Sequence, residues 1–283
     1  VARGAAIDII KDNPNVDKIY EYHKDRKKIK NLALKVKEEK YDLLIDFSEM
    51  LRVNQMMLIN LCGARINIGI EKDSWNLFDI SLNVRDFDKH ISEMYIKILK
   101  FLGINNINSS YDVFSSDYLL KKLDLENKKY CVFNPYAASK HRSFSTENIE
   151  KISKIILEKN YEKLILIGNE DKIRELKKLS ISKENKVKII ETRGMAEVAE
   201  LIKGANLVVS PDTSIVHLAR AFDKKMICIY RKELGKEDKN SILWGPNSEK
   251  AKVIFVEEKV KDGEEIDINH INLDEFKKEM ERV

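Results

Sequence analysis

The chain has 283 residues, of which 43% are hydrophobic and 35% are charged, as in a water-soluble globular protein that is long enough for two domains. No stretch approaches the roughly 18 apolar residues that a membrane-spanning helix needs, which excludes an integral helical membrane protein. The net charge is only +4, and the basic residues are spread along the chain, which argues against a dedicated nucleic-acid-binding protein.

The three cysteines lie far apart in apolar sequence, at Cys62, Cys131 and Cys228. This spacing predicts buried free thiols rather than disulfides or metal ligands. The first residues also lack the apolar core of a secretory signal. We therefore expect a cytoplasmic protein.

Apolar periodicity in the first half of the chain predicts alternating helices and strands. The predicted elements are a helix over residues 5–12, a strand over 16–22, a helix over 26–39, a buried strand over 41–47, a helix over 49–61, a strand over 65–70 and a helix over 90–102. The stretch that follows, 104–129, is polar. We place the boundary of an N-terminal domain there, at residues 1–115.

The second half alternates more regularly and predicts a second domain over residues 116–260. Its expected strands cover residues 130–134, 163–168, 187–191, 207–210, 226–230 and 253–256, with helices over 146–160, 171–179, 195–203 and about 214–222. Strands that alternate with helices of about ten residues indicate an α/β fold with a parallel, doubly wound sheet. A tail, residues 261–283, carries a helix over 273–282 that is expected to pack back on the N-terminal domain.

The turn at residues 211–214, after the strand at 207–210, is the strongest candidate for a binding site. Asp212, Thr213 and Ser214 are residue types that cap a helix, and a helix that opens directly after a strand presents its free N–H groups and positive dipole end to an anion. Such a turn can bind phosphate. His217 lies about one helical turn further on and faces the same opening. An ordinary N-cap followed by a partly buried helix with one satisfied histidine explains the same residues.

Two further loops follow strands of this sheet, and ligands in such sheets bind at the carboxyl ends of the strands. Lys140, His141 and Arg142 follow the strand at 130–134 and could hold a diphosphate, although a solvated basic loop is an equal alternative. Asn169 and Glu170 follow the strand at 163–168 and could bind a ribose or a base. A helix cap with an acid in its first turn explains that pair at least as well.

No Gly-rich loop ending in Lys-Ser/Thr and no GxGxxG motif occurs, which disfavours classical nucleotide hydrolysis and dinucleotide redox chemistry.

Three segments together resemble the successive signatures of glycosyltransferase family 9, the ADP-heptose:lipopolysaccharide heptosyltransferases. They are NPYAASK (134–140), GMAEVAELI (194–202) and SPDTSIVHLA (210–219). The segments NPNVD (13–17) and YDLLIDF (41–47) are similar to parts of the family's first domain. The resemblance covers most of the chain.

This resemblance implies a GT-B architecture, in which two Rossmann-like domains face each other across a cleft. The donor binds the C-terminal domain and the acceptor binds the N-terminal one, without a metal ion or other cofactor. It also implies transfer of a sugar, heptose in this family, from a nucleotide-diphosphate donor to a lipopolysaccharide-core or related glycan acceptor, with peripheral contact to the inner membrane.

Particular residues take their expected roles from the same resemblance. Lys140 would neutralise the donor diphosphate, Asp212 would bind the sugar hydroxyls and His217 would stand beside the phosphates. We therefore predict these three as catalytic. The expected donor-binding residues are Asn134, Ser139, Asn169, Glu170, Met195, Asp212, Thr213, Ser214 and Ile215.

The chain departs from the family pattern in two places. Ser214 stands where the family normally has glycine. The family's first strand, and the Gly-Asp loop that carries its presumed catalytic base, have no counterpart before Asn13. We therefore expect an incomplete N-terminal domain and leave the base unassigned, with Asp46 as a weak substitute because an acid at a strand end is usually a cap. The alternatives to a glycosyltransferase are a non-catalytic sugar-nucleotide-binding relative and a sugar-nucleotide epimerase or hydrolase of similar fold.

Overall fold

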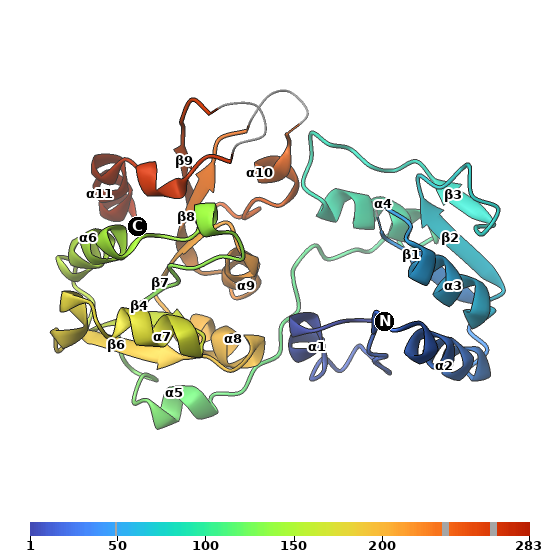
Figure 1. Cartoon of the computed structure of the whole chain (residues 1–283), viewed down its shortest axis with the longest axis horizontal. Helices are drawn as coiled ribbons and strands as arrows, with labels where there is room; N and C mark the ends of the chain where they lie inside the picture. Colours follow the sequence, from blue (N-terminus) through green and yellow to red (C-terminus); the bar gives the residue numbers. More distant parts are fainter. Residues whose placement is uncertain (49, 234–237, 261–264) are drawn as a thin grey trace. The chain divides into compact units, whose positions relative to one another are not determined.

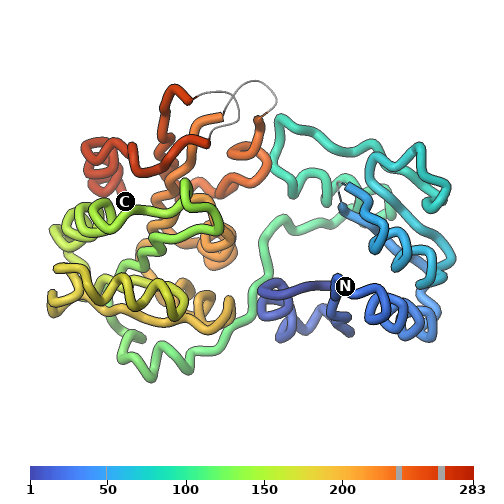
Figure 2. The backbone as a smooth tube through the Cα atoms, in the orientation of Figure 1, coloured from blue at the N-terminus to red at the C-terminus, as the bar shows by residue number. Residues whose placement is uncertain are grey.

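A computed structural model of the chain describes residues 1–48, 50–233, 238–260 and 265–283. The chain forms two compact units (Figures 1 and 2). Unit 1 consists of Val1–Ile7 and Pro14–Ser109, and unit 2 consists of Asp8–Asn13 and Ser110–Val283. The short helix α1 (Ala5–Ile10) spans the division between them.

Unit 2 is built on a sheet of six parallel strands in the order β6-β5-β4-β7-β8-β9. The chain therefore adds strands outward from β4 on one side and then returns to the other side of β4 to begin β7. This reversal makes a switch point between the carboxyl ends of β4 and β7, where doubly wound sheets bind their ligands. The strands are β4 (Tyr130–Phe133), β5 (Lys163–Gly168), β6 (Val187–Glu191), β7 (Leu207–Pro211), β8 (Lys225–Arg231) and β9 (Ala251–Val256).

Both faces of this sheet are buried. Along β4, Cys131 and Phe133 contribute to one apolar cluster, and Tyr130 and Val132 contribute to a second one. Successive side chains of a strand point to opposite faces, so a strand covered by helices on both sides needs an unbroken apolar run. One face is covered by α6 (Thr146–Leu157), α7 (Glu170–Leu176) and α11 (Leu273–Arg282), and the other by α5 (Tyr118–Lys122), α8 (Met195–Gly204) and α9 (Ser214–Ala221) (Figure 1).

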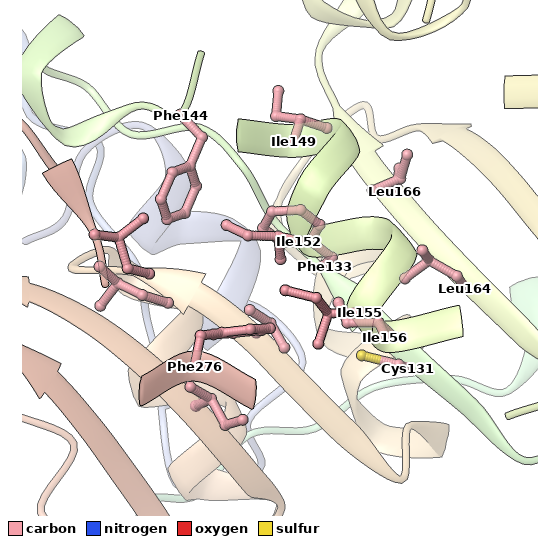
Figure 3. Packing of buried hydrophobic residues seen from close by; sticks show 14 of the residues in the cluster. Cys131, Phe133, Phe144, Ile149, Ile152, Ile155, Ile156, Leu164, Leu166 and Phe276 are labelled. Carbon is pink, nitrogen blue, oxygen red and sulfur yellow. The ribbon is translucent and has the colours of Figure 1, made fainter. Parts of the chain in front are cut away.

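The first of these clusters lies between the sheet, α6 and α11 (Figure 3). Phe133 of β4 meets Phe144 edge-on, with ring centroids 5.9 Å apart. Phe276 and Met280 are the buried residues of α11, and both belong to this cluster. The tail helix thus packs in the core of unit 2, whereas the sequence led us to expect it on the N-terminal domain.

Unit 1 contains a smaller parallel sheet in the order β1-β2-β3. Leu44 of β1 packs with α2 and α3, while its neighbour Ile45 packs with α4, so helices again lie on two faces. The elements are β1 (Leu43–Asp46), β2 (Ile66–Ile70), β3 (Ile80–Leu82), α2 (Arg26–Glu38), α3 (Val53–Cys62) and α4 (Ser92–Phe101).

The structure confirms the predicted α/β class with parallel sheets and differs from the sequence analysis in several short segments. The expected strand at 16–22 does not form, and one isolated bridge joins Ala2 to Glu21. The first strand, expected to be buried, is half-buried, and Leu43 is exposed. Helix α3 begins at Val53; residue 49, where we expected it to begin, lies outside the described residues, as do 234–237 and 261–264 of the predicted second domain and tail. The strand β3 and the short helices α5 and α10 (Asn240–Leu243) were not predicted.

Within the ranges that the structure describes, no helix is both long enough and apolar enough to cross a membrane.

Candidate active site

Asn134 joins the two strands at the switch point. Its backbone N–H donates to the carbonyl of Val209 at 2.9 Å. Its side-chain amide donates to the carbonyl oxygen of Tyr136 at 2.9 Å and to the hydroxyl of Ser210 at 3.0 Å. The side chain is 5% exposed, so these bonds satisfy a buried polar group and fix the ends of β4 and β7 relative to each other.

Helix α9 opens directly after β7 and is capped by Thr213. The Thr213 hydroxyl accepts a hydrogen bond from the N–H of Ile215 at 3.3 Å and lies 3.0 Å from the Ser210 hydroxyl. Ser214 begins the helix and is exposed. The positive end of the helix dipole therefore points out of the carboxyl edge of the sheet, which is suited to an anion.

A basic segment from the preceding loop reaches the same place. The 3-10 turn η1 (Lys140–Arg142) follows Asn134. Arg142 donates from Nη1 to Oδ2 of Asp212 at 3.3 Å, and Asn240 of α10 donates to the same oxygen at 3.0 Å. Lys140 is exposed. The loops after β4 and β7 therefore meet at one edge, as we expected of loops that follow the carboxyl ends of parallel strands.

His217 lies one turn into α9 and is half-buried. Its ring centroid is 6.4 Å from that of Tyr111. Burial lowers the pKa of His217, and the nearby carboxylate of Asp212 opposes this effect. The imidazole is thus neutral at pH 7, able to donate one hydrogen bond and accept another.

Lowering the pH from 7.5 to 5.5 is expected to destabilise the wild-type protein more than a His217→Gln variant. Burial holds the pKa of His217 below the usual value for histidine, 6.5, so the unfolded chain binds more protons than the folded protein in the pH window below that value. The stability that comes from the neutral imidazole is fully present above the usual histidine pKa. It is lost as the pH falls toward the lower pKa of the folded protein. Thermal unfolding midpoints at the two pH values measure the difference. The exposed His141, changed to Gln, is the control; an identical pH response in wild type and His217→Gln would contradict the prediction.

Several other predicted residues lie around this edge. Met195 begins α8, and its sulfur is 4.0 Å from the Ser214 hydroxyl, which places it beside the start of α9. Ile215 is buried and packs in the second apolar cluster. Ser139 precedes η1, and its hydroxyl donates to Glu265 at 3.0 Å.

Asn169 and Glu170 follow β5, next to β4 in the sheet. The Asn169 side chain caps α7 by accepting from the N–H of Lys172 at 3.1 Å. Glu170 forms an exposed ion pair with Arg174 at 2.9 Å. Asn169 is thus the helix cap and Glu170 the first-turn acid that the sequence offered as the alternative, and a role of either residue in donor binding stays a prediction.

Asp46 has a similarly local role, because its carboxylate accepts from the hydroxyl of Ser48 at 2.6 Å. Among the described residues, no group of three or more His, Cys, Asp or Glu side chains is arranged to hold a metal ion.

The site includes two residues that the predicted set lacked, Arg142 and Asn240. Arg142 had a signal in the sequence as one of three adjacent cations. Asn240 had none, because it lies 28 residues beyond its partner Asp212 in a helix of four residues.

Known proteins resemble the chain over most of its length. It is 22% identical over 247 residues to lipopolysaccharide heptosyltransferase 1 of Campylobacter coli, covering 78% of this chain and 71% of that protein. The solved glycosyltransferase family 9 protein of Veillonella parvula has a TM-score of 0.80 at 16% identity, covering 97% of this chain and 84% of that one. The E. coli ADP-heptose lipopolysaccharide heptosyltransferase II has a TM-score of 0.72 at 15% identity, covering 96% and 85%.

These solved structures show that the fold is of the GT-B glycosyltransferase type. The sequence model of glycosyltransferase family 9 (heptosyltransferase) matches residues 29–269, which is most of the chain. The chain therefore belongs to glycosyltransferase family 9 and is a glycosyltransferase.

Proposed function

We propose that the protein transfers heptose from ADP-heptose to a lipopolysaccharide-core or related glycan acceptor. One observation carries the proposal: Arg142 of the basic turn η1 contacts Asp212, the residue just before the capped start of α9, at the switch point of a doubly wound sheet. Such an edge suits a nucleoside diphosphate. The names of the relatives support heptose as the sugar, a lipopolysaccharide as the acceptor and, for one of them, ADP-heptose as the donor. We place the reaction in the cytoplasm, at the inner face of the membrane that carries such an acceptor.

In the mechanism that we propose, the acceptor hydroxyl displaces ADP directly from the anomeric carbon of the donor. The departing diphosphate gains negative charge as the glycosidic bond breaks. Lys140 and the N-terminus of α9 stabilise this charge, so that no metal ion is required. Asp212 accepts hydrogen bonds from sugar hydroxyls, and neutral His217 lies one turn further along α9. The base that deprotonates the acceptor is unassigned.

Calorimetric titration with ADP, UDP and GDP tests the donor site. We expect ADP to bind most tightly, and we expect Lys140→Ala to weaken it about tenfold, as for the loss of a charge-assisted hydrogen bond. Failure of all three nucleotides to bind would contradict a donor site at this edge.

Mass spectrometry of a heptose-deficient lipopolysaccharide acceptor, incubated with ADP-heptose and the enzyme, tests the transfer itself. The expected result is a mass increase of one heptose. Tight ADP-heptose binding without product would indicate a non-catalytic binding protein, and consumption of donor without acceptor would indicate a hydrolase or epimerase.

A further inference from the structure

The carboxylate of Asp212 is the point at which three separate connections of unit 2 meet. Asp212 follows β7, Arg142 belongs to the turn after β4, and Asn240 begins the helix after β8. Both partners donate to the same oxygen, Oδ2, at 3.3 Å from Arg142 and 3.0 Å from Asn240. The side chain of Asp212 is only 15% exposed and that of Arg142 is 33% exposed. One carboxylate oxygen is thus held from two directions.

Asn240 is itself anchored to β8. Its backbone N–H donates to Asp238 at 3.4 Å, and Asp238 forms an ion pair with Arg231 at the end of that strand. At the far end of α10, the carbonyl of Trp244 accepts from the hydroxyl of Tyr230 at 3.1 Å. The amide that reaches Asp212 therefore projects from a segment fixed at both ends.

Arg142 is held in a comparable way. Its backbone N–H donates to the carbonyl of Ser139 at 3.2 Å, and the Ser143 hydroxyl donates back to the same carbonyl at 3.0 Å. Phe144, two residues on, is buried in the core under α6. The guanidinium thus projects from a turn whose backbone is closed on itself.

The two bonds define which oxygen of Asp212 is left for a ligand. Across the described ranges, no hydrogen-bond donor reaches Oδ1, whereas Oδ2 has two. A carboxylate fixed in this way can accept from a sugar hydroxyl without first reorganising, and such preorganisation increases affinity and selectivity.

We propose that Arg142 and Asn240 are positioning residues, which hold the Asp212 carboxylate so that Oδ1 recognises the sugar of the donor. This inference rests on the proposed donor site. It assigns the two residues to recognition of the sugar and not of the nucleotide. If Arg142 instead bound the diphosphate directly, its loss would lower the affinities for ADP and for ADP-heptose equally.

The experiment compares dissociation constants for ADP and ADP-heptose in the same protein samples. Asn240→Ala is the first variant because it removes a donor without changing the charge of the site. We expect the affinity for ADP-heptose to fall about fivefold to tenfold, as for the loss of one hydrogen bond to a charged group, while the affinity for ADP changes less than about twofold. Retained ADP binding also shows that the variant is folded.

Arg142→Gln is the second variant. Arg282→Gln on α11 is the control, because it removes an exposed arginine that pairs with Glu279. In the wild-type background, we expect Arg142→Gln to lower the affinity for ADP-heptose more than the affinity for ADP. In an Asp212→Asn background it should add no further loss specific to the sugar, because both changes act through one carboxylate. We expect Arg282→Gln to leave both affinities unchanged.

The possible outcomes separate this inference from the proposed function. If the wild-type protein binds neither ADP nor ADP-heptose, both are overturned. If the wild-type protein binds ADP-heptose and the two variants leave the ratio of the affinities unchanged, the positioning role alone is wrong and the donor site stands.

Discussion

Replacing Lys140 by alanine is expected to slow sugar transfer by about 10²–10³-fold, the usual loss when one preorganised group that stabilises transition-state charge is removed. Lys140 lies in η1, two residues before the arginine that reaches Asp212. Its ammonium would approach the diphosphate as the glycosidic bond breaks and negative charge accumulates there. Because this interaction strengthens in the transition state, most of the loss should fall on kcat rather than on KM.

Steady-state kinetics with ADP-heptose and a heptose-deficient lipopolysaccharide acceptor measure this effect. Lys151→Ala is the matched control, since it removes a lysine from the helix that follows the same loop, where its partner is the exposed Glu147. We expect the control to retain full activity. A Lys140→Ala enzyme with unchanged kcat would show that another group neutralises the leaving diphosphate.

The architecture of unit 2 was readable from the sequence because its central strands are buried on both faces. Such strands are continuous apolar runs bounded by polar turns, and this pattern placed β5 at the residues that the structure shows. The helices between them carry one-sided apolar periodicity and recognisable caps, such as Ser145 before α6. Here local signals and tertiary structure agree.

Unit 1 shows where local signals fail. The segment at 16–22 is rich in the β-branched and aromatic residues that strands favour, yet it makes only the single bridge at Glu21. Its side chains are used differently: Tyr20 and Tyr22 pack against the cluster under α2 and α3, and Lys18 pairs with Glu39. A strand needs a neighbour along its length, and a sequence pattern does not state whether that neighbour is present.

The candidate site was partly predictable, because only some of its residues lie in segments with a local sequence signature. The capping turn at Asp212 and Thr213 has a local signature, and the strand order of a doubly wound sheet brings the loop with Lys140 to it. Asn240 could not be found in this way, because its role depends on where β8 leaves the sheet. Conversely, Glu170 is of a residue type that often binds sugars and follows a strand, which suggested a binding role. In the structure it pairs with Arg174, an ordinary interaction between residues four apart in a helix.

Replacing Phe276 by alanine is expected to lower the free energy of unfolding of unit 2 by about 3–5 kcal/mol, the range for truncating a buried phenylalanine. Phe276 is 0% exposed and joins α11 to the core that contains Phe144 and the helix α6 (Figure 3). Removing its ring leaves a cavity in the core between α11 and the rest of unit 2. We therefore expect the variant to bind ADP more weakly at temperatures close to its unfolding midpoint.

Urea denaturation monitored by tryptophan fluorescence can measure the stability of unit 2 separately, because Trp244 lies in unit 2 and Trp75 in unit 1. With Trp75→Phe in every sample, the signal reports on unit 2 alone. Phe255→Ala is the matched control: it removes the same ring from β9, where the side chain is 43% exposed, and should cost less than about 1 kcal/mol. Equal losses in the two variants would mean that α11 is not part of the core. A loss confined to Phe276→Ala would instead show that α11 supports the sheet whose edge carries the proposed donor site.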